Sequence, residues 1–184
     1  MGGKLIKHAP LSRQEVWDIA LEVTTWLGAN VEVGGSYARG DTLIGDVDLL
    51  IEGNVEDFKD KLEKKWGNCK NGNPKRTGEI NGVQVDLMFA PLEYYGASQL
   101  AIRGCGEFNV GMRSNAKKMG FKLSQYGLFK RDTDERVAGD TEMSIFEAMG
   151  MEYVKPEHRT GFDIVQKALK GSYKAWAIEE SWWE

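Results

Sequence analysis

The spacing of apolar and polar residues changes along the first part of the chain from helical to strand-like. Residues 11–28 place apolar side chains three and four positions apart, which predicts a helix with one buried face. Ser12 and Glu15 form the capping-box pair typical of a helix start. Strands are predicted at Val31–Val33 and at Gly45–Glu52. This part of the chain therefore predicts a helix packed on a sheet.

The following segment predicts a helix, a loop and a β-hairpin. A helix is expected after Asn54, because asparagine is a favoured N-cap residue. Residues 68–78, rich in glycine, asparagine and lysine, are expected to form a loop. Asn81 and Gly82 are a typical hairpin turn, and apolar and polar residues alternate over residues 83–89.

The second half of the chain predicts short helices and a small sheet. Helices are expected from Glu93, over Glu107–Met119 and over Thr141–Met149. Alternation predicts one strand over Phe121–Phe129, and Glu135–Ala138 is expected to pair with it.

Length and composition are typical of a globular chain with one or two small domains. Of its 184 residues, 41% are hydrophobic and 28% are charged. A change in residue pattern near Pro91 predicts a boundary between two lobes there. The predicted fold class is α/β (α+β), with a mixed antiparallel sheet flanked by helices and a small α+β second domain.

Cysteine, histidine and apolar content argue against zinc proteins and membrane proteins. Cys69 and Cys105 lack the spacing of metal ligands, and the two histidines, His8 and His158, lie far from them in sequence. No apolar run approaches the roughly 20 residues needed to span a bilayer. We expect an intracellular, cytoplasmic monomer that does not bind membranes.

Charge is distributed unevenly along the chain. The net charge of −4 argues weakly against a nucleic-acid partner. Residues 101–131, however, contain seven basic residues and the single acid Glu107. Two interpretations stay open, a basic surface for nucleic acid and the solvated face of a helix. The basic residues are Arg103, Arg113, Lys117, Lys118, Lys122, Lys130 and Arg131.

Three aspartates are the candidate catalytic groups. Asp46 and Asp48 are two positions apart in a predicted strand and so share one face of it. Asp86 lies on the polar face of the predicted hairpin, from which it can reach the same sheet face. Adjacent carboxylates repel each other unless a cation lies between them, and oxygen-only donors favour Mg²⁺ or Mn²⁺ over zinc. The alternative is an ordinary pair of surface or turn aspartates at positions 46 and 48.

A glycine and serine turn precedes these aspartates. Gly34, Gly35 and Ser36 follow the first predicted strand, where backbone N–H groups and a hydroxyl can approach phosphate oxygens. Arg39, one turn later, adds a charged fork for the same phosphates. With the three carboxylates, this pattern indicates nucleotidyl transfer assisted by two metal ions. A Walker-type site is excluded because the chain has no GxxxxGKS or GxxxxGKT motif.

Three stretches of the sequence resemble one enzyme family. GGSYARGDTLIGDVDLLI is similar to the DNA polymerase beta superfamily of nucleotidyltransferases, which includes enzymes that tail tRNA or modify antibiotics. GCGEFNVGMRSNAKKMGFKLSQYGLF and EYVKPEHR narrow the resemblance to family X DNA polymerases, and within them to minimal viral-type members built of palm and thumb. The resemblance, over about residues 7–160, implies a template-directed DNA polymerase that fills short gaps in DNA repair. It implies two Mg²⁺ ions, which Mn²⁺ can replace, a palm at residues 1–90 and a thumb at 91–160.

The resemblance also implies a role for each candidate residue. The metal-binding catalytic residues are Asp46, Asp48 and Asp86, and the nucleotide-binding residues are Gly35, Ser36, Arg39, Ala101, Gly104 and Asn109. The residues expected to bind primer-template or gapped DNA are Arg113, Lys117, Lys118 and Lys122. Without the family pattern, Asn109 would be interpreted as a helix cap and Arg113 as a surface arginine.

Two departures from the family pattern bear on activity. Ala101 and Ile102 replace the aromatic pair that usually helps to exclude a 2′-hydroxyl, so we expect ribonucleotides to be accepted besides dNTPs. No lyase domain precedes Leu11, so we expect no lyase activity. The alternative functions are a template-independent nucleotidyltransferase acting on RNA or protein, and an inactive nucleic-acid-binding or antitoxin-like module.

The last stretch, GFDIVQKALKGSYKAWAIEESWWE, lies outside the resemblance. Its aromatic residues are expected to pack on the second domain, and stacking on bases or contact with a partner are the alternatives. They are Tyr173, Trp176, Trp182 and Trp183.

Overall fold

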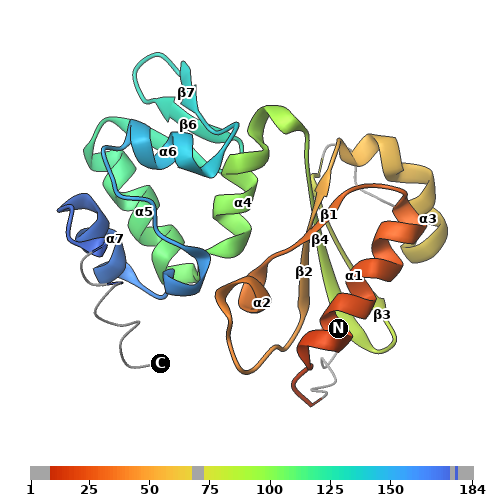
Figure 1. Ribbon diagram of the computed structural model, residues 1–184. Coiled ribbons are helices and arrows are strands. Elements are labelled where there is room, and N and C mark those ends of the chain that lie inside the picture. Colours follow the sequence, from red (N-terminus) through yellow and green to blue (C-terminus); the bar gives the residue numbers. More distant parts are fainter. Residues whose placement is uncertain (1–8, 68–72, 175–176, 178–184) are drawn as a thin grey trace, which may run out of the picture. The chain divides into compact units, whose positions relative to one another are not determined.

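The computed structural model describes residues 9–67, 73–174 and 177, and the chain folds into two units (Figure 1). The first unit is Met1–Phe89 and the second is Ala90–Glu184. Each unit has its own hydrophobic core.

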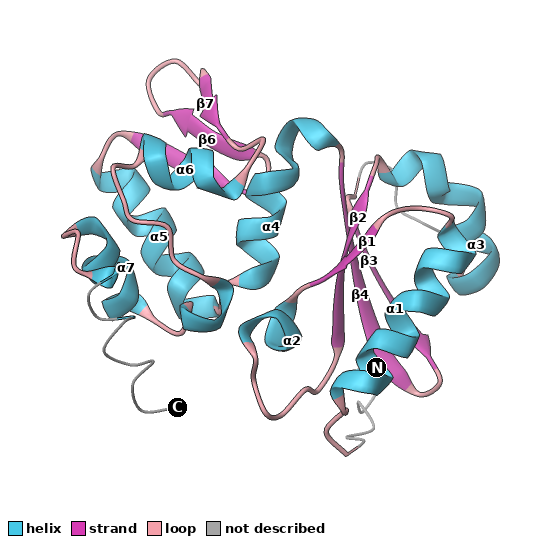
Figure 2. Cartoon of the chain, in the orientation of Figure 1, coloured by secondary structure: helices cyan, strands magenta, loops and turns pink. Residues whose placement is uncertain are grey.

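A four-stranded sheet with its helices forms the first unit. Its elements are α1 (Arg13–Leu27), β1 (Val31–Val33), α2 (Gly35–Arg39), β2 (Val47–Glu52), the 3₁₀ turn η1 (Val55–Phe58), α3 (Lys59–Trp66), β3 (Lys75–Ile80) and β4 (Val83–Ala90). The strand order is β1-β2-β4-β3, and β1 pairs with β2, and β3 with β4, in antiparallel fashion. Helices α1 and α3 lie on one face of the sheet (Figure 2). The apolar side chains of β2 and β4 share one core with those of α1, which leaves their polar side chains on the other face.

Helix α1 begins and ends where the sequence predicts. The Glu15 backbone N–H donates a hydrogen bond to Ser12 Oγ at 3.2 Å, and the Ser12 backbone N–H donates to the Glu15 carboxylate at 2.8 Å. Gly28 ends the helix with φ at 67°, a left-handed conformation that glycine adopts without steric cost. Val16 and Val23 are fully buried, so the predicted apolar face is confirmed.

Two boundaries in the first unit differ from the prediction. Strand β3 occupies Lys75–Ile80, where a loop was expected over residues 68–78. It is an edge strand with exposed polar residues, so it lacks the apolar alternation that reveals a strand with a buried face. Strand β2 begins at Val47, so Asp46 lies one residue before it. The predicted hairpin turn at Asn81 and Gly82 is confirmed, with Ile80 paired to Val83.

A three-stranded sheet and four α-helices form the described part of the second unit. Its elements are η2 (Leu92–Tyr94), α4 (Tyr95–Arg103), α5 (Gly106–Lys118), β5 (Phe121–Ser124), β6 (Gly127–Lys130), β7 (Arg136–Ala138), α6 (Glu142–Ala148), η3 (Pro156–His158) and α7 (Phe162–Leu169). The strand order is β5-β6-β7, with antiparallel pairing throughout. Phe108, Phe146 and Ile164, from α5, α6 and α7, are buried in one core.

The segment predicted as one strand over Phe121–Phe129 is a hairpin. Gln125 and Tyr126 form the turn between β5 and β6, and Ser124 pairs with Gly127. This turn lacks the Asn-Gly or Asp-Gly signature of a two-residue hairpin, and the alternation of the flanking residues runs across it. The predicted pairing of residues 135–138 with this segment is confirmed in β7.

The described part of the C-terminal stretch packs into the core of the second unit. Ile164 and Val165 of α7 and the ring of Tyr173 are buried there. The Tyr173 hydroxyl accepts a hydrogen bond from the Lys155 backbone N–H at 3.0 Å. The expected packing is therefore confirmed for Tyr173, whereas Trp176, Trp182 and Trp183 lie outside the described residues.

The structure also bears on the sequence-based expectations about membrane spans and cysteines. In the ranges 9–67 and 73–174, no helix is long and apolar enough to cross a bilayer. Cys105 is a free thiol whose Sγ accepts the Phe108 backbone N–H at 3.4 Å at the start of α5. Cys69 lies outside the described residues.

Candidate active site

Two of the three predicted catalytic carboxylates lie on neighbouring central strands. Asp48 is on β2 and Asp86 is on β4, which are adjacent in the sheet. Both are half-buried, and they alternate along their strands with fully buried residues such as Val47 and Val85. Asp46 precedes β2 instead of lying within it, which corrects the prediction that it shares a strand with Asp48.

The three carboxylates nevertheless act on one another electrostatically. Burial, together with the charges of Asp46 and Asp86, raises the pKa of the Asp48 carboxyl from 3.8 to about 6. Arg39 and Lys75 oppose this shift through their positive charges. A carboxyl pKa raised by burial and by neighbouring carboxylates indicates a site where added positive charge is favourable.

The donor set fits a divalent cation by its chemistry. Three carboxylates offer only oxygen donors, which Mg²⁺ and Mn²⁺ prefer, and a cation would relieve the repulsion that raises the pKa of Asp48. Within residues 9–67 and 73–174, no three acidic, histidine or cysteine side chains are grouped closely enough to form a ready-made metal cluster. The Asp86 oxygens instead accept hydrogen bonds from the Thr77 hydroxyl and from Gln84 Nε2, the latter at 2.8 Å.

The glycine and serine turn packs directly against Asp48. The Gly34 backbone N–H donates to the Asp48 backbone oxygen at 2.8 Å. A Cβ added at Gly35 would lie 1.9 Å from Asp48 Oδ2, and Gly35 has φ at +57°, so this position requires glycine. The Ser36 Oγ atom is buried and has no hydrogen-bond partner among the residues that the structure describes. An unpartnered buried hydroxyl beside a glycine turn is suited to a ligand oxygen.

Arg39 is close to the carboxylates but is already paired. Its Nη2 atom lies 2.8 Å from Asp41 Oδ2, and the Arg39 side chain is 17% exposed. Its charge still lowers the pKa of Asp48. The structure thus brings Gly35, Ser36 and Arg39 to the carboxylates, all within the first unit.

Three further polar residues of this site were missed at the level of sequence. Gln84 is two positions before Asp86 in β4, so strand alternation alone puts it on the same face. Thr77 pairs with Asp86 across the hairpin, a register that follows from the Asn81-Gly82 turn once β3 is extended beyond the predicted loop. Lys75, which acts on Asp48, had no signal because its segment was interpreted as a loop.

The other predicted nucleotide-binding residues lie together in the second unit, at the junction of α4 and α5. Asn109 Nδ2 donates to the Ala101 carbonyl at 2.8 Å and to the Gly104 carbonyl at 3.2 Å. A Cβ added at Gly104 would lie 2.4 Å from Asn109 Oδ1. The three residues therefore form one packed turn, in which Asn109 has the capping role that was the alternative interpretation.

The four predicted DNA-binding residues are exposed, and three of them line one surface cavity. Arg113, Lys117 and Lys122 surround a cavity of about 420 Å³ together with Arg131. Lys118 lines a neighbouring cavity of about 570 Å³. Arg131 lines both cavities, and sequence reasoning did not assign it a role although it counted the residue as basic.

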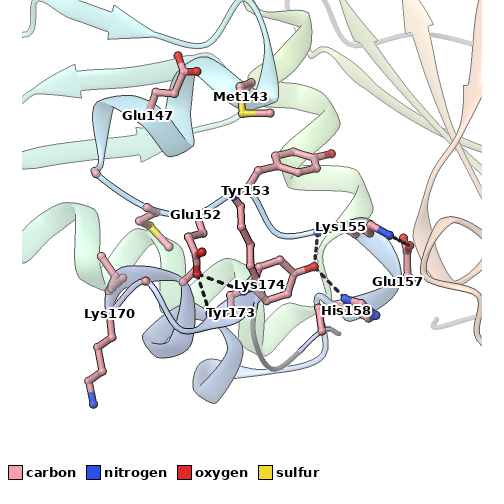
Figure 3. A pocket seen from close by; sticks show the side chains of 16 residues that line it. Met143, Glu147, Glu152, Tyr153, Lys155, Glu157, His158, Lys170, Tyr173 and Lys174 are labelled. Carbon is pink, nitrogen blue, oxygen red and sulfur yellow. Dashed lines mark hydrogen bonds and ion pairs between the residues drawn. The ribbon is translucent and has the colours of Figure 1, made fainter. Parts of the chain in front are cut away.

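A separate cavity of about 1150 Å³ lies in the second unit (Figure 3). Its wall includes Met143 of α6, Tyr153, and Tyr173 after α7. Glu152 there accepts hydrogen bonds from the backbone N–H groups of Tyr173 at 2.7 Å and Lys174 at 3.3 Å. None of the predicted site residues lines this cavity, so the candidate site does not include it.

Two family models match consecutive parts of the chain. The model described as nucleotidyltransferase domain matches residues 17–103, and the model described as DNA polymerase beta thumb matches residues 100–160. The first match contains the three aspartates, and the second contains the basic residues of α5 and the β5-β6 hairpin.

Relatives and a solved structure agree with these matches. The repair DNA polymerase X of African swine fever virus (strain Badajoz 1971 Vero-adapted) is 27% identical over 172 residues, which are 86% of this chain and 96% of the viral protein. DNA polymerase IV of Saccharomyces cerevisiae is 33% identical over 92 residues, which are 50% of this chain and 14% of the yeast protein. A polymerase beta of Leishmania infantum, solved as a ternary P/T complex, superposes with a TM-score of 0.68 at 24% identity and covers 84% of this chain and 78% of its own. The fold class predicted from the sequence is confirmed by this likeness.

Proposed function

The chain belongs to the family X DNA polymerases of the nucleotidyltransferase superfamily, and we propose that it fills short gaps in DNA during repair. As a DNA-directed DNA polymerase, it would add template-matched nucleotides to a primer 3′-hydroxyl. The observation that carries this proposal is the meeting of Asp48 and Asp86 on adjacent strands, next to a glycine turn with an unpartnered buried hydroxyl at Ser36. In this proposal residues 1–90 are the palm, 91–160 the thumb and 161–184 a C-terminal extension.

The aspartates would hold the divalent metal on which polymerases of this kind depend. Asp46, Asp48 and Asp86 are the proposed ligands of two Mg²⁺ ions, with Mn²⁺ as a substitute. When bound, the metal would lower the pKa of the attacking 3′-hydroxyl and neutralise the pyrophosphate that leaves. Thr77 and Gln84 each donate a hydrogen bond to one oxygen of the Asp86 carboxylate and so hold it in place. The Asp86 side chain would therefore lose little conformational freedom when it binds a metal ion.

The turn before β2 would bind the triphosphate. The Ser36 hydroxyl, unpartnered among the described residues, would donate to a phosphate oxygen. Arg39 would exchange its half-exposed partner Asp41 for a second phosphate oxygen, because an arginine fork binds phosphate strongly. Gly35 brings the backbone close to the ligand, since it has no side chain to occupy that space.

The second unit would bind the nucleotide's sugar and base, and the DNA. Ala101, Gly104 and Asn109 form the turn proposed to face the sugar, with Asn109 also at the minor-groove edge of the incoming base. Arg113, Lys117, Lys118 and Lys122 would contact DNA backbone phosphates, and Arg131 joins them because it lines the same cavities. Without an aromatic side chain at position 101, ribonucleotides would be discriminated only weakly.

Primer extension on a duplex with a one-nucleotide gap tests this function. Each dNTP and rNTP is supplied separately opposite each template base, with Mg²⁺. Template-matched addition is expected, and Asp86→Ala should abolish it while circular dichroism shows an intact fold. The matched control is Asp18→Ala, which removes an exposed acid of α1 that accepts a hydrogen bond from Gln14 Nε2 at 2.8 Å.

Other outcomes distinguish the alternatives. Addition that ignores the template base would indicate a template-independent nucleotidyltransferase. DNA binding without any addition would indicate an inactive binding module.

A further inference from the structure

The last turn of α4 with its C-cap, residues Ala101–Gly104, is called the α4 turn here and is held first by Asn109. Its amide group donates to the carbonyl oxygens of Ala101 and Gly104, at 2.8 and 3.2 Å. Carbonyl groups at the C-terminal end of a helix lack partners within that helix. Asn109 supplies such partners and so orders the backbone of this α4 turn.

A buried ion pair holds the same turn from a second direction. Arg103, the last residue of α4, places its Nη1 atom 2.8 Å from Glu142 Oε2. The Glu142 side chain is 5% exposed and that of Arg103 is 22% exposed. A charge-assisted hydrogen bond shielded from water is stronger and more directional than one at the surface.

Glu142 is itself fixed in place by its surroundings. Arg159, which is fully buried, lies with Nη1 2.5 Å from Glu142 Oε1, and the Tyr153 hydroxyl donates to Oε2 at 3.0 Å. Arg159 donates twice more to the Val154 carbonyl, at 3.0 and 2.9 Å. The Arg159 carbonyl accepts the Cys105 backbone N–H at 3.3 Å, so the residue that follows the α4 turn is bound to the same group of residues.

In the α4 turn, the backbone is the group available to exclude a 2′-hydroxyl sterically. Position 101 has only a methyl group, Gly104 has no side chain, and the Ile102 side chain is buried in the protein. A carbonyl group can exclude a 2′-hydroxyl only if the backbone that carries it does not move aside. The sugar selectivity that this turn can provide therefore depends on how rigidly it is held.

We infer that Arg103 is a positioning residue for sugar selection, which holds the α4 turn rigid through its ion pair with buried Glu142. The substrate concerned is a nucleoside triphosphate, and the inference rests on the proposed function. Arg103 thus supports the limited sugar discrimination that the backbone of the α4 turn can provide without an aromatic side chain at position 101.

The test compares Arg103→Ala and Arg103→Lys with the parent. Single-turnover insertion of dGTP and of rGTP opposite template C gives the ratio of kcat/KM for the two sugars. Arg103→Ala is expected to lower this ratio by about tenfold, mainly through faster rGTP insertion, while Arg103→Lys keeps the ion pair and most of the ratio. Arg103→Ala is expected to fold, because Arg159 still neutralises Glu142.

Lys167→Ala is the matched control. It removes an exposed ion pair of the same unit, in which Lys167 Nζ lies 3.4 Å from Asp163 Oδ2 on α7. The sugar ratio of this variant should equal that of the parent.

A readout without DNA or nucleotide separates positioning from general stability. Hydrogen exchange of the amides of residues 100–106 should be faster in Arg103→Ala than in the parent, while exchange in α7 is unchanged. Faster exchange throughout the second unit, or an unchanged sugar ratio in Arg103→Ala, would overturn the inference. A parent that inserts dGTP and rGTP equally well would also overturn the inference, because its α4 turn would then not exclude the 2′-hydroxyl. A parent that inserts no nucleotide overturns the proposed function as well, whereas an active parent with an unchanged ratio in the variant overturns the inference alone.

Discussion

Gly35 shows how a residue without a side chain leaves room for a carboxylate that is proposed to be catalytic. The Asp48 carboxylate occupies the space that a Cβ at position 35 would need, at a separation of 1.9 Å. Gly40, at the other end of α2, also has a positive φ, +76°, but no heavy atom lies within 4 Å of its would-be Cβ. Comparing an alanine substitution at each glycine therefore distinguishes the effect of backbone strain from the effect of displacing Asp48.

Gly35→Ala is expected to reduce nucleotide insertion by at least about 100-fold, because a shift of about 1 Å in a catalytic group has effects of that size. Gly40→Ala introduces similar left-handed strain, about 1–2 kcal/mol, without touching Asp48. Thermal melting should show comparable losses from strain, and kcat/KM should fall sharply only for Gly35→Ala. Equal losses of activity in both variants would argue against a role for the Gly35–Asp48 contact.

Ala101 is a second position where a single side chain has a predicted effect. Ala101→Tyr is expected to increase the preference for dGTP over rGTP by at least about tenfold, or about 1.4 kcal/mol, because it restores the missing bulk. The measurement is kcat/KM for both nucleotides opposite template C. Ala148→Tyr, at an exposed position of α6, is the control for adding a tyrosine. If the parent already rejects rGTP by several orders of magnitude, the expectation of weak discrimination is wrong.

At the scale of elements, α5 and the β5-β6 hairpin present one basic surface. Arg113 and Lys117 come from α5, whereas Lys122 and Arg131 come from the hairpin and the residue after it, and all four line one cavity. Asp134 is the acid in that cavity, and its pairing with Lys122 is long, 4.0 Å, and highly exposed. Such a pair contributes little to stability, so Lys122 can exchange it for a phosphate.

We predict that Lys117→Ala, Lys118→Ala and Lys122→Ala each reduce the slope of log K against log salt by about one unit, since each removes one phosphate contact. Binding to gapped DNA is measured by fluorescence anisotropy at several salt concentrations. Lys64→Ala, an exposed lysine of α3, should leave the slope unchanged. If none of the three variants differs from the parent, these lysines form only a solvated helix face.

At the scale of the whole molecule, the candidate active site lowers the free energy of unfolding at neutral pH. Because the pKa of Asp48 is raised from 3.8 to about 6 in the folded state, the folded state binds a proton there more tightly than the unfolded state. The stability that this tighter proton binding gives the folded state is fully present below about pH 4 and is lost as the pH rises through 6. At neutral pH the ionised carboxylate is kept at the expense of stability, as is common in active sites.

Asp48→Asn is therefore expected to stabilise the metal-free protein at pH 7.5 by up to about 3 kcal/mol, the equivalent of a shift of about two pKa units, and to abolish activity. The measurement is urea unfolding of parent and variant in EDTA at pH 4 and 7.5. The difference should nearly vanish at pH 4, where the parent carboxyl is protonated. Added Mg²⁺ should narrow it at pH 7.5, because a ligand that binds only the folded parent stabilises it. A variant that is less stable than the parent at pH 7.5 would show that burial does not strain Asp48.

Much of this protein followed from the sequence by itself, because the features concerned depend on residues close together in the chain. The capping box at Ser12 and Glu15, the turn at Asn81 and Gly82, and the polar face that carries Asp86 are all local patterns. Each is read from spacing alone, since a helix or a strand repeats its geometry every few residues. The candidate residues of the active site could likewise be named, although their roles remain proposals.

Only the tertiary structure decided which distant residues meet. Strand β3 has no hydrophobic signal of its own and exists because β4 offers a pairing edge, which brings Thr77 to Asp86. In the sequence Glu142 is an ordinary acid in the first turn of a short helix. The fold buries it between Arg103, 39 positions away, and Arg159, 17 positions away. Burial and pairing depend on the packing of whole elements, and no short-range pattern contains that information.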